Sequence, residues 1–323
     1  MLAFLRQRWF LLGLIGVLVA GITWPTMMRP VASLISGDVI LALVTFIMAL
    51  PLETRMLWRA VRRPGPAWLG SLLSIAVAPP LGWLASRVLP TELAAGVVLA
   101  TTVPSTLASA AVLTRRAGGN DAVAFLVTMI TSLTCFLVIP SWLMLLVGIR
   151  AEVNFGQIVI GLMLLVVLPI IMAQLLRQWP PIGSRATRHK AVLSVIAQVG
   201  VLVMVLIGAV FCGERVATLE NDSEVTLLNI LLMIVAVAAV HTAIVVMGFA
   251  LSRMLSIDKA DAVAVAFSGG QKTLMVGAFL AMAIGPLAIL PMVAYHAAQL
   301  IIDSLIADWL RARGEAARLG TER

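Results

Sequence analysis

Two polar segments lie inside long hydrophobic stretches of the chain, where a helix facing lipid would avoid them. Residues 101–109 read Thr-Thr-Val-Pro-Ser-Thr-Leu-Ala-Ser, and residues 267–273 read Phe-Ser-Gly-Gly-Gln-Lys-Thr. Proline removes a backbone donor, and neighbouring hydroxyl groups can satisfy the carbonyl groups that it frees. A Gly-Gly pair followed by an amide and an amine at this depth is costly unless it lines a cavity. We therefore predict two interrupted helices that line a binding site.

The interrupted segments supply groups that bind ions and polar solutes. Unwound carbonyl groups can coordinate a cation, whereas the N-termini of half-helices favour anions. The candidate contacts for a substrate or a coupling ion in these segments are Ser105, Thr106, Ser268, Lys272 and Thr273.

A third polar feature lies on the last hydrophobic segment. His296, Gln299 and Asp303 are spaced i, i+3 and i+7, which places them on one face of a helix. This stripe either contacts substrate, or pairs Asp303 with Lys272, or forms a buried hydrogen-bonded network that holds helices together. His241 is more typical of a satisfied interior histidine than of a metal ligand.

The elements that position these residues are hydrophobic helices. Of the 323 residues, 61% are hydrophobic and 12% are charged, and the mean hydropathy is +1.07. Soluble domains carry about a quarter of charged residues, so this composition excludes an ordinary soluble protein. Hydrophobic stretches of about 20 residues predict transmembrane helices, because lipid forces every backbone group to be satisfied within its own helix. We predict an all-α polytopic membrane protein with ten spans, at residues 9–28, 31–51, 66–86, 93–114, 122–149, 155–176, 191–212, 226–251, 260–283 and 286–307.

Basic residues are divided unevenly between the two sides that these spans define. With the N-terminus in the cytoplasm, 18 of the 23 Lys and Arg residues lie on the cytoplasmic side. These are Arg6, Arg8, Arg55, Arg59, Arg62, Arg63, Arg115, Arg116, Arg177, Arg185, Arg188, Lys190, Arg253, Lys259, Arg311, Arg313, Arg318 and Arg323. Cytoplasmic loops accumulate such residues, so we predict a multi-pass protein of the inner or plasma membrane with both termini in the cytoplasm. The same rule accounts for the net charge of +8 without a nucleic-acid partner.

Other kinds of chemistry find no support in the sequence. The motifs of nucleotide-binding loops, serine hydrolases, zinc proteases and dithiol enzymes do not occur. Cys135 and Cys212 lie in hydrophobic stretches, which argues against a structural disulfide. We therefore predict that the chain is not an enzyme and needs no cofactor or metal, apart from Na⁺ or H⁺ as a coupling ion.

The two interrupted segments fall at matching positions, in the fourth span of each five-span half. Interruptions so placed point to a transporter binding site, and halves with an odd number of spans can be inverted repeats. We predict a single transporter domain over residues 1–323, with one repeat over 9–149 and a second over 155–307. Residues 308–323 would be a cytoplasmic tail, with a disordered end from residue 314.

Four groups of residues resemble the bile acid:sodium symporter family, and within it the orphan branch related to the sodium/bile acid cotransporter 7 proteins. They are the segments 104–109, 117–122 and 266–274, and the set Tyr295, His296, Gln299 and Asp303. The resemblance covers nearly the whole chain and implies ten helices in two inverted five-helix repeats. Spans three to five and eight to ten would form a core domain, and spans one, two, six and seven a panel. Spans four and nine would cross at their unwound centres, with substrate between core and panel.

The same resemblance implies a sodium site that is altered in this chain. In the better-known symporters, the matching segments bind two sodium ions through Pro-Gly-Gly-Thr-Ala-Ser-Asn in the fourth span and Glu-x-Gly-x-Gln-Asn in the ninth. Ser109, Thr128 and Gln271 keep the sodium-site residue types, so they are the candidate ion ligands. The substituted positions are Ala110 for an asparagine, Ala124 for a serine, Phe267 for the glutamate and Lys272 for the other asparagine.

Lys272 changes the electrostatics of such a site. Two like charges about 4 Å apart repel by about 4 kcal/mol at an effective dielectric constant near 20, so a sodium ion beside a charged Lys272 would bind weakly. Our hypothesis is that Lys272 replaces one bound sodium, either as a fixed cation or as a proton carrier, because burial disfavours the charged amine. The alternative is a permanent salt bridge to Asp303 or Asp38.

Together these observations predict a secondary active transporter that moves a small, anionic organic solute by alternating access. Its partners would be that solute and the lipid bilayer, with sodium as the coupling ion that the resemblance implies. One alternative is a proton-coupled or sodium-independent carrier that uses Lys272. Another is a cation/proton antiporter, for which Asp303 and Asp38 are the available carboxylates. A sensor that binds without transporting, and a membrane-embedded enzyme, are the remaining classes.

Overall fold

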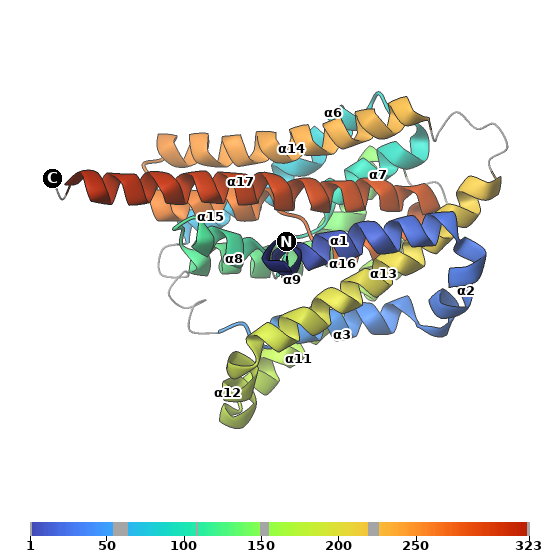
Figure 1. Ribbon diagram of the computed structural model, residues 1–323, viewed down its shortest axis with the longest axis horizontal. Helices are drawn as coiled ribbons and strands as arrows, with labels where there is room; N and C mark the ends of the chain where they lie inside the picture. The colour runs from blue at the N-terminus through green and yellow to red at the C-terminus, as the bar shows by residue number, and fades with distance from the viewer. Residues whose placement is uncertain (1, 54–63, 108, 149–154, 219–225, 322–323) are drawn as a thin grey trace.

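The structure is a computed structural model that describes residues 2–53, 64–107, 109–148, 155–218 and 226–321. Helices make up nearly all of these residues, and no strand occurs among them. The long helices lie roughly side by side along one axis of the molecule (Figure 1). The prediction of an all-helical polytopic protein is therefore confirmed.

The first half of the chain ends with its longest helix, α9. In order they are α1 (Leu2–Thr23), α2 (Pro25–Leu34), α3 (Gly37–Ala49), α5 (Gly65–Leu72), the π-helical segment η1 (Leu73–Val77), α6 (Ala78–Ser86), α7 (Thr91–Thr102), α8 (Ser109–Arg116) and α9 (Asp121–Leu146).

The second half contains the longest helices of the chain. They are α10 (Phe155–Leu162), the π-helical segment η2 (Met163–Val167), α11 (Leu168–Arg177), α12 (Pro180–Arg188), α13 (Lys190–Thr218), α14 (Leu227–Met254), α15 (Lys259–Gly270), α16 (Leu274–Ile284), the 3₁₀ turn η4 (Pro286–Ala288) and α17 (Ile289–Thr321).

Seven helical stretches of the described chain are long and apolar enough to cross a membrane, or eight if a bent pair counts as one span. The seven coincide with seven of the ten predicted spans. They are Gly65–Ser86, Asp121–Leu146, Phe155–Arg177, Lys190–Thr218, Leu227–Met254, Lys259–Ile284 and Pro286–Arg313. The predicted span 93–114 is divided between the shorter helices α7 and α8.

The predicted boundaries at the two ends of the chain are wrong. The first two spans, 9–28 and 31–51, do not match the helices, because α1 ends at Thr23 and α2 leaves it at an angle of 113°. Pro25 opens α2 and has no N–H with which to continue α1. At the other end, residues 314–321 continue α17 as a helix instead of being disordered. Alanine, glutamate, arginine and leucine, which dominate that segment, are strong helix formers.

The helices pack into two groups. In the first, α13 lies along α1, α2 and α3, and α3 also packs against α11. In the second, α15 packs against α5, α8, α9 and α14, and α17 packs against α7, α8 and α14. The two groups meet where α16 and η4 contact α13.

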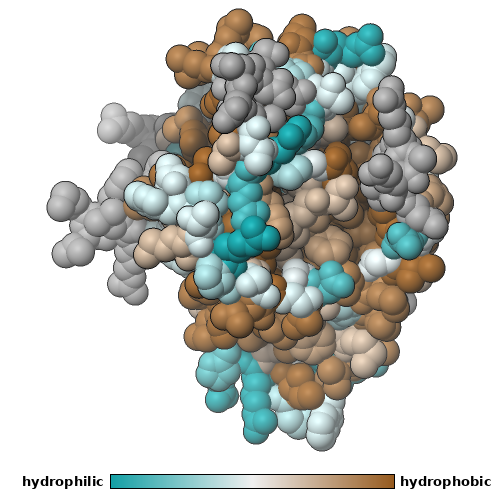
Figure 2. Space-filling view, turned by 90° about the vertical axis from the view of Figure 1, so that its right-hand side faces the viewer, coloured by the Kyte–Doolittle hydropathy of each residue, from teal (hydrophilic) through white to brown (hydrophobic). Residues whose placement is uncertain are grey.

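Large hydrophobic side chains remain exposed along several helices. Examples are Ile15 on α1, Leu164 on η2, Leu175 on α11 and Val235 on α14. A view along the long axis shows hydrophobic residues on either side of a band of hydrophilic residues that crosses the middle of this end (Figure 2). Exposed apolar area of this extent fits helices that face lipid.

Candidate transport site

The two interrupted helices touch each other at their breaks. Residues 103–107 separate α7 from α8, and residues 271–273 separate α15 from α16. The N–H of Thr273 donates to the carbonyl oxygen of Pro104 at 2.9 Å, and the N–H of Ser105 donates to Thr131 Oγ1 at 3.1 Å. We call these two non-helical segments the crossing. The sequence therefore located both breaks correctly.

Lys272 at the crossing is 1% exposed, and its ammonium group is bound by a single residue of η1. Its Nζ donates to the carbonyl oxygen of Ser74 at 2.7 Å and to Ser74 Oγ at 2.8 Å. The carbonyl is free because the N–H of Ala78 bonds to Leu73 instead, and Pro79 has no N–H to offer.

The neighbouring carbonyl group shows the same effect of Pro79. Its usual donor would be the missing N–H of Pro79, and the indole N–H of Trp142 takes that place, at 2.8 Å from the oxygen of Ile75. The π-helical turn and its proline thus create two oxygen acceptors in the interior, one of which binds Lys272.

The predicted alternative of a salt bridge from Lys272 to Asp303 or Asp38 is wrong. Asp38 is exposed at the start of α3, and no carboxylate among the described residues pairs with Lys272. Asp303 is fully buried. Its Oδ2 accepts from Gln271 Nε2 at 2.7 Å, and its Oδ1 lies 2.9 Å from His241 Nε2.

His241 and Asp303 form a fully buried pair. His241 Nδ1 lies 3.2 Å from the carbonyl oxygen of Gly270, which can only accept, so Nδ1 carries a hydrogen. Nε2 faces Oδ1 of Asp303, so both side chains have hydrogen-bond partners inside the protein, as buried polar groups in a membrane require.

Gln271 connects this pair to the space between the helix groups. Ser109 Oγ donates to Gln271 Oε1 at 2.8 Å, while Gln271 Nε2 donates to Asp303. Both polar atoms of the Gln271 side chain are therefore engaged by protein groups. Thr128 lies close by, with its hydroxyl donating to Ala124 at 3.0 Å and contacting the carbonyl oxygen of Thr106 at 3.4 Å.

The stripe on α17 forms a network and also reaches a cavity. Gln299 holds the backbone of Lys272 on both sides, because its Oε1 accepts from the Lys272 N–H at 2.7 Å and its Nε2 donates to the carbonyl oxygen at 2.9 Å. Tyr295 donates to Gly270 at 2.8 Å. His296 contacts Gln299 Nε2 at 2.8 Å and also lines a small cavity beside Thr106 and Thr273.

Two of the predicted serines lie on opposite sides of the crossing. Ser268 is buried and donates to the carbonyl oxygen of Ala264 within its own helix. Ser105 is also buried, but its Oγ has no hydrogen-bond partner in the described part of the chain. It lines a narrow cavity with Pro104, Thr273 and Ser132.

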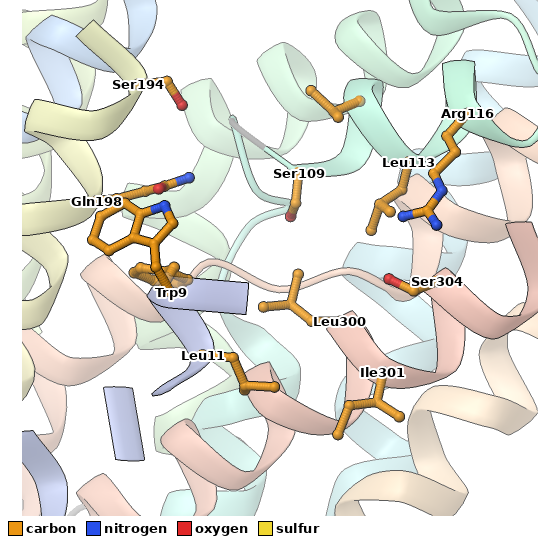
Figure 3. Close-up of a pocket in the computed structure, with 12 residues that line it drawn as sticks. Trp9, Leu11, Ser109, Leu113, Arg116, Ser194, Gln198, Leu300, Ile301 and Ser304 are labelled. Atoms are coloured by element: carbon orange, nitrogen blue, oxygen red, sulfur yellow. The ribbon is translucent and has the colours of Figure 1, made fainter. Parts of the chain in front are cut away.

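A partly open cavity lies between the two helix groups and reaches toward the crossing. It measures about 360 Å³, which is within the range of small-molecule sites. Ser109, Arg116, Leu300 and Ile301 line it from α8 and α17, and Trp9, Ser194 and Gln198 line it from α1 and α13 (Figure 3). The side chains of Ser109 and Gln198 project into the space from opposite walls (Figure 3). A smaller cavity of about 80 Å³ continues past Phe10 and Ser109 to Thr106, Thr273 and His296.

An ion pair between α7 and α13 joins the two helix groups away from this cavity. Arg215, at the end of α13, lies 3.3 Å from Glu92 on α7, which links the two helix groups. Glu92 also accepts from the N–H of Leu287 at 3.2 Å. Helix α8 lies toward one end of the long axis and α7 toward the other, and α13 runs between these ends (Figure 1).

Comparison with known proteins places this architecture. Residues 8–312 match the model of the SBF-like CPA transporter family. The chain belongs to this family. The SBF-like CPA transporters are membrane transporters of the bile acid symporter type, so the chain is a multi-pass transporter and not an enzyme. The family that the residues of the two breaks resemble is thereby confirmed.

Individual relatives align with about three quarters of this chain or more. Sodium/bile acid cotransporter 7-B of Xenopus laevis is 25% identical over 336 aligned positions, which cover 98% of this chain and 96% of that protein. The uncharacterized sodium-dependent transporter YocS of Bacillus subtilis is 26% identical, covering 94% of this chain and 91% of its own. The uncharacterized protein PA2026 of Pseudomonas aeruginosa is 30% identical over 76% of this chain and 73% of its own.

Sequence reasoning missed the partner of Asp303 and the partner of Lys272. A signal for the first exists, since His241 and Asp303 are titratable residues in apolar helices, and such residues need partners in a membrane. Ser74 carries no comparable signal, except that Pro79 and Pro80 follow it and must leave nearby carbonyl groups without donors.

Proposed function

We propose that this SBF-like CPA transporter is a secondary active carrier that moves a small, anionic organic solute by alternating access. The observation that carries the proposal is the asymmetry of the space between the helix groups. A cavity of about 360 Å³ leads from one end toward the crossing, while Glu92 and Arg215 join the groups at the other end. One access path is open and the other is shut, as expected for one state of an alternating-access cycle.

In this proposal the two helix groups are the moving parts. The group of α1, α2, α3, α11 and α13 is the panel, and the group of α5, α7, α8, α9, α14, α15 and α17 is the core. The breaks between α7 and α8 and between α15 and α16 support a ten-helix fold of two inverted repeats, over residues 9–149 and 155–307. The repeats would be two copies of one unit that meet at the crossing.

The solute would bind in the cavity between panel and core. Ser194 and Gln198 on α13 and Ser304 on α17 line it and have no hydrogen-bond partner among the described residues. Arg116 adds a positive charge, which it shares with Asp308 at 2.6 Å. A solute with a carboxylate and further polar groups could satisfy these side chains. Ser105, whose buried hydroxyl is unpartnered, would serve a group or ion that reaches the crossing.

Sodium is the first candidate for the coupling ion. Ser109 and Gln271 are in contact, and Thr128 lies beside the carbonyl of Thr106. The printed name of the Bacillus subtilis relative, a sodium-dependent transporter, supports the same ion. Lys272 would take the place of a second sodium, because its ammonium group already occupies the two oxygen atoms of Ser74.

A sodium-independent or proton-coupled carrier is the second candidate, and two observations favour it. Phe267 is fully buried where the resemblance expects a glutamate, and Asp303 shares its charge with His241. No described group at the crossing thus offers a free carboxylate to a cation. For the same reason a cation/proton antiporter would have to break the pair of His241 and Asp303.

The proposed location is the inner or plasma membrane, with both termini in the cytoplasm. The excess of Lys and Arg on that side supports this orientation. The large cavity would then face the cytoplasm, because it lies near the end of α8 that carries Arg116 and the end of α13 that carries Lys190.

Thermal unfolding of the purified protein tests the coupling ion without a known substrate. NaCl is exchanged for choline chloride at fixed ionic strength, at pH 6 and at pH 8. A ligand at ten times its dissociation constant adds about 1.4 kcal/mol of stability. A rise in Tm specific to sodium supports symport. No sodium effect, with a pH-dependent Tm that is lost in Lys272→Met, supports the proton-coupled carrier.

A sensor that binds without transporting is separated from a carrier by flux. Proteoliposomes preloaded with candidate organic anions are measured for exchange, beside equilibrium binding of the same compounds. Binding without exchange for every bound compound would overturn the transport proposal.

A further inference from the structure

The short helix α12 stands apart from the helix groups. It follows α11 after Trp179 and precedes α13, and it projects to one side of the ends of these two helices (Figure 1). Helices of the bundle cover only one of its faces. Ala186 is buried and Ile182 is partly buried, while Arg185 and Arg188 are exposed, with Arg188 at the groove between α11 and α12.

The exposed face of α12 is strongly basic. Arg185, Arg188 and Lys190 are exposed, and none of them forms an ion pair with a described residue. The sequence contains no Asp or Glu between residues 155 and 213. Glu53 lines the groove between α11 and α12 beside Arg177 and Arg188. Lys190, which opens α13, lines a second cavity with Glu53 and Asp121. Arg177 is itself engaged with the carbonyl oxygen of Leu50 and with Thr187.

Along the segment that leads into α12, exposed apolar residues are followed by a residue type that is typical of the membrane–water interface. On α11, Met172 and Leu175 are exposed and apolar, as expected for contact with lipid chains. Trp179, which comes next at the end of the helix, is 63% exposed. Tryptophan is enriched at the level of the lipid headgroups, and basic residues beyond it meet the charged surface of the membrane. A loop that extended into water would have no use for an exposed tryptophan at this point.

From this order of residues we infer that α12 lies along the membrane surface and binds the headgroups of anionic phospholipids. Trp179 marks the depth of the interface, and Arg185, Arg188 and Lys190 contact phosphate groups. Guanidinium groups bind phosphate oxygens through paired hydrogen bonds. The helix would thus hold the panel at a fixed depth while the core moves.

Quenching of Trp179 by brominated lipids tests this inference directly. The full-length protein is reconstituted in phosphatidylcholine nanodiscs that contain brominated phosphatidylglycerol or, in parallel, brominated phosphatidylcholine at the same mole fraction. The difference between wild type and Trp179→Phe isolates the Trp179 signal from the other tryptophans. We expect several-fold stronger quenching by the anionic lipid, and a loss of this preference at high salt.

Charge neutralisation supplies the matched controls. The triple variant Arg185→Gln, Arg188→Gln, Lys190→Gln should lose the preference, because each basic residue near an anionic surface contributes about fivefold in affinity. A second triple variant, Arg253→Gln, Lys259→Gln, Arg313→Gln, removes the same charge from other exposed sites and should keep it. Equal quenching by both lipids in wild type would overturn the inference and leave α12 as a solvated helix or a site for another partner. An equal loss in both triple variants would also overturn it.

Discussion

The ammonium group of Lys272 can remain buried because the helix opposite offers it oxygen atoms that no backbone bond uses. Pro79 withholds an N–H, the π-helical turn shifts the bond of Ala78, and Ser74 is left with a free carbonyl beside its hydroxyl. Two oxygens at 2.7–2.8 Å from an ammonium resemble part of the oxygen shell that a sodium ion requires. This geometry is the physical basis for treating Lys272 as a substitute for an ion.

Replacing Lys272 with Met should therefore create a response to sodium. The variant removes the charge and leaves both oxygens of Ser74 without a donor, at a cost of about 1–3 kcal/mol in stability. Sodium can then fill the vacated position, so the Tm of Lys272→Met should rise more in NaCl than in choline chloride. The exposed lysine variant Lys259→Met is the control and should behave as wild type. A response to sodium identical in wild type and Lys272→Met would refute the substitution.

The pair of His241 and Asp303 should behave as one unit in a mutant cycle. Asp303→Ala leaves a buried histidine and the amide of Gln271 unpaired, which should cost about 3–5 kcal/mol of unfolding free energy. Adding His241→Ala should cost much less than the sum of the two single changes, because the partner is already lost. Unfolding in mixed micelles measures these differences. Asp308→Ala, on the same helix but exposed, should cost no more than about 1 kcal/mol. Additive effects at His241 and Asp303 would contradict the pairing.

At the scale of elements, α1 and α13 in the panel pack with their backbones close together. A Cβ atom on Gly213 would lie 2.7 Å from the carbonyl oxygen of Ile22, and one on Gly21 would lie 2.6 Å from Ala209. Small residues at 209 and 213 are one turn apart, so they let the two backbones approach as membrane helices often do. The bend after α1 begins at the same place.

Adding a single methyl group should separate these two helices. Gly213→Ala forces backbone against backbone, and we expect a loss of about 1–3 kcal/mol in stability. Gly16→Ala, at an exposed position of α1, has nothing within 4 Å of the added atom. It should be neutral or slightly stabilising, because alanine is the better helix former. Thermal unfolding compares the two, and an equal effect would mean that the contact has no part in stability.

How well the sequence predicts an interruption of a helix depends on which residues form that interruption. The breaks at 103–107 and 271–273 were predictable, since proline and the Gly-Gly-Gln-Lys string have few other uses in a membrane. The bend at Trp24 was not, because Pro25 and Pro30 also fit a surface loop. The π-helical turn η1 was not either, since hydropathy does not reveal which carbonyl bonds to which N–H. Which residue a buried side chain hydrogen-bonds to, such as Ser74 for Lys272, depends on how the helices are rotated against each other. The composition of a helix does not determine this rotation.

At the scale of the whole molecule, cavities lead from one side toward the crossing, and an ion pair joins the two helix groups elsewhere. Phe10 and Gln198 on the panel and Ser109 on the core line both the large cavity and the small one beside the crossing. On the other side, Glu92 joins α7 to Arg215 and to η4. In the proposed cycle, a movement of panel against core would close the large cavity and separate Glu92 from Arg215, because α13 takes part in both. The ion pair at Glu92 is partly exposed, so breaking it costs little and suits a reversible closure.

Accessibility of a cysteine at position 198 tests alternating access most directly. Gln198→Cys is made in a chain whose buried cysteines, Cys135 and Cys212, are replaced by Ser or Ala. An impermeant maleimide should label it in inside-out vesicles and much less in right-side-out vesicles. Adding Glu92→Gln should raise labelling from the outside several-fold, because it weakens the closed end. Equal labelling from both sides without that change, or outside labelling that Glu92→Gln leaves unaltered, would contradict the account of a cytoplasm-facing cavity closed by Glu92 and Arg215.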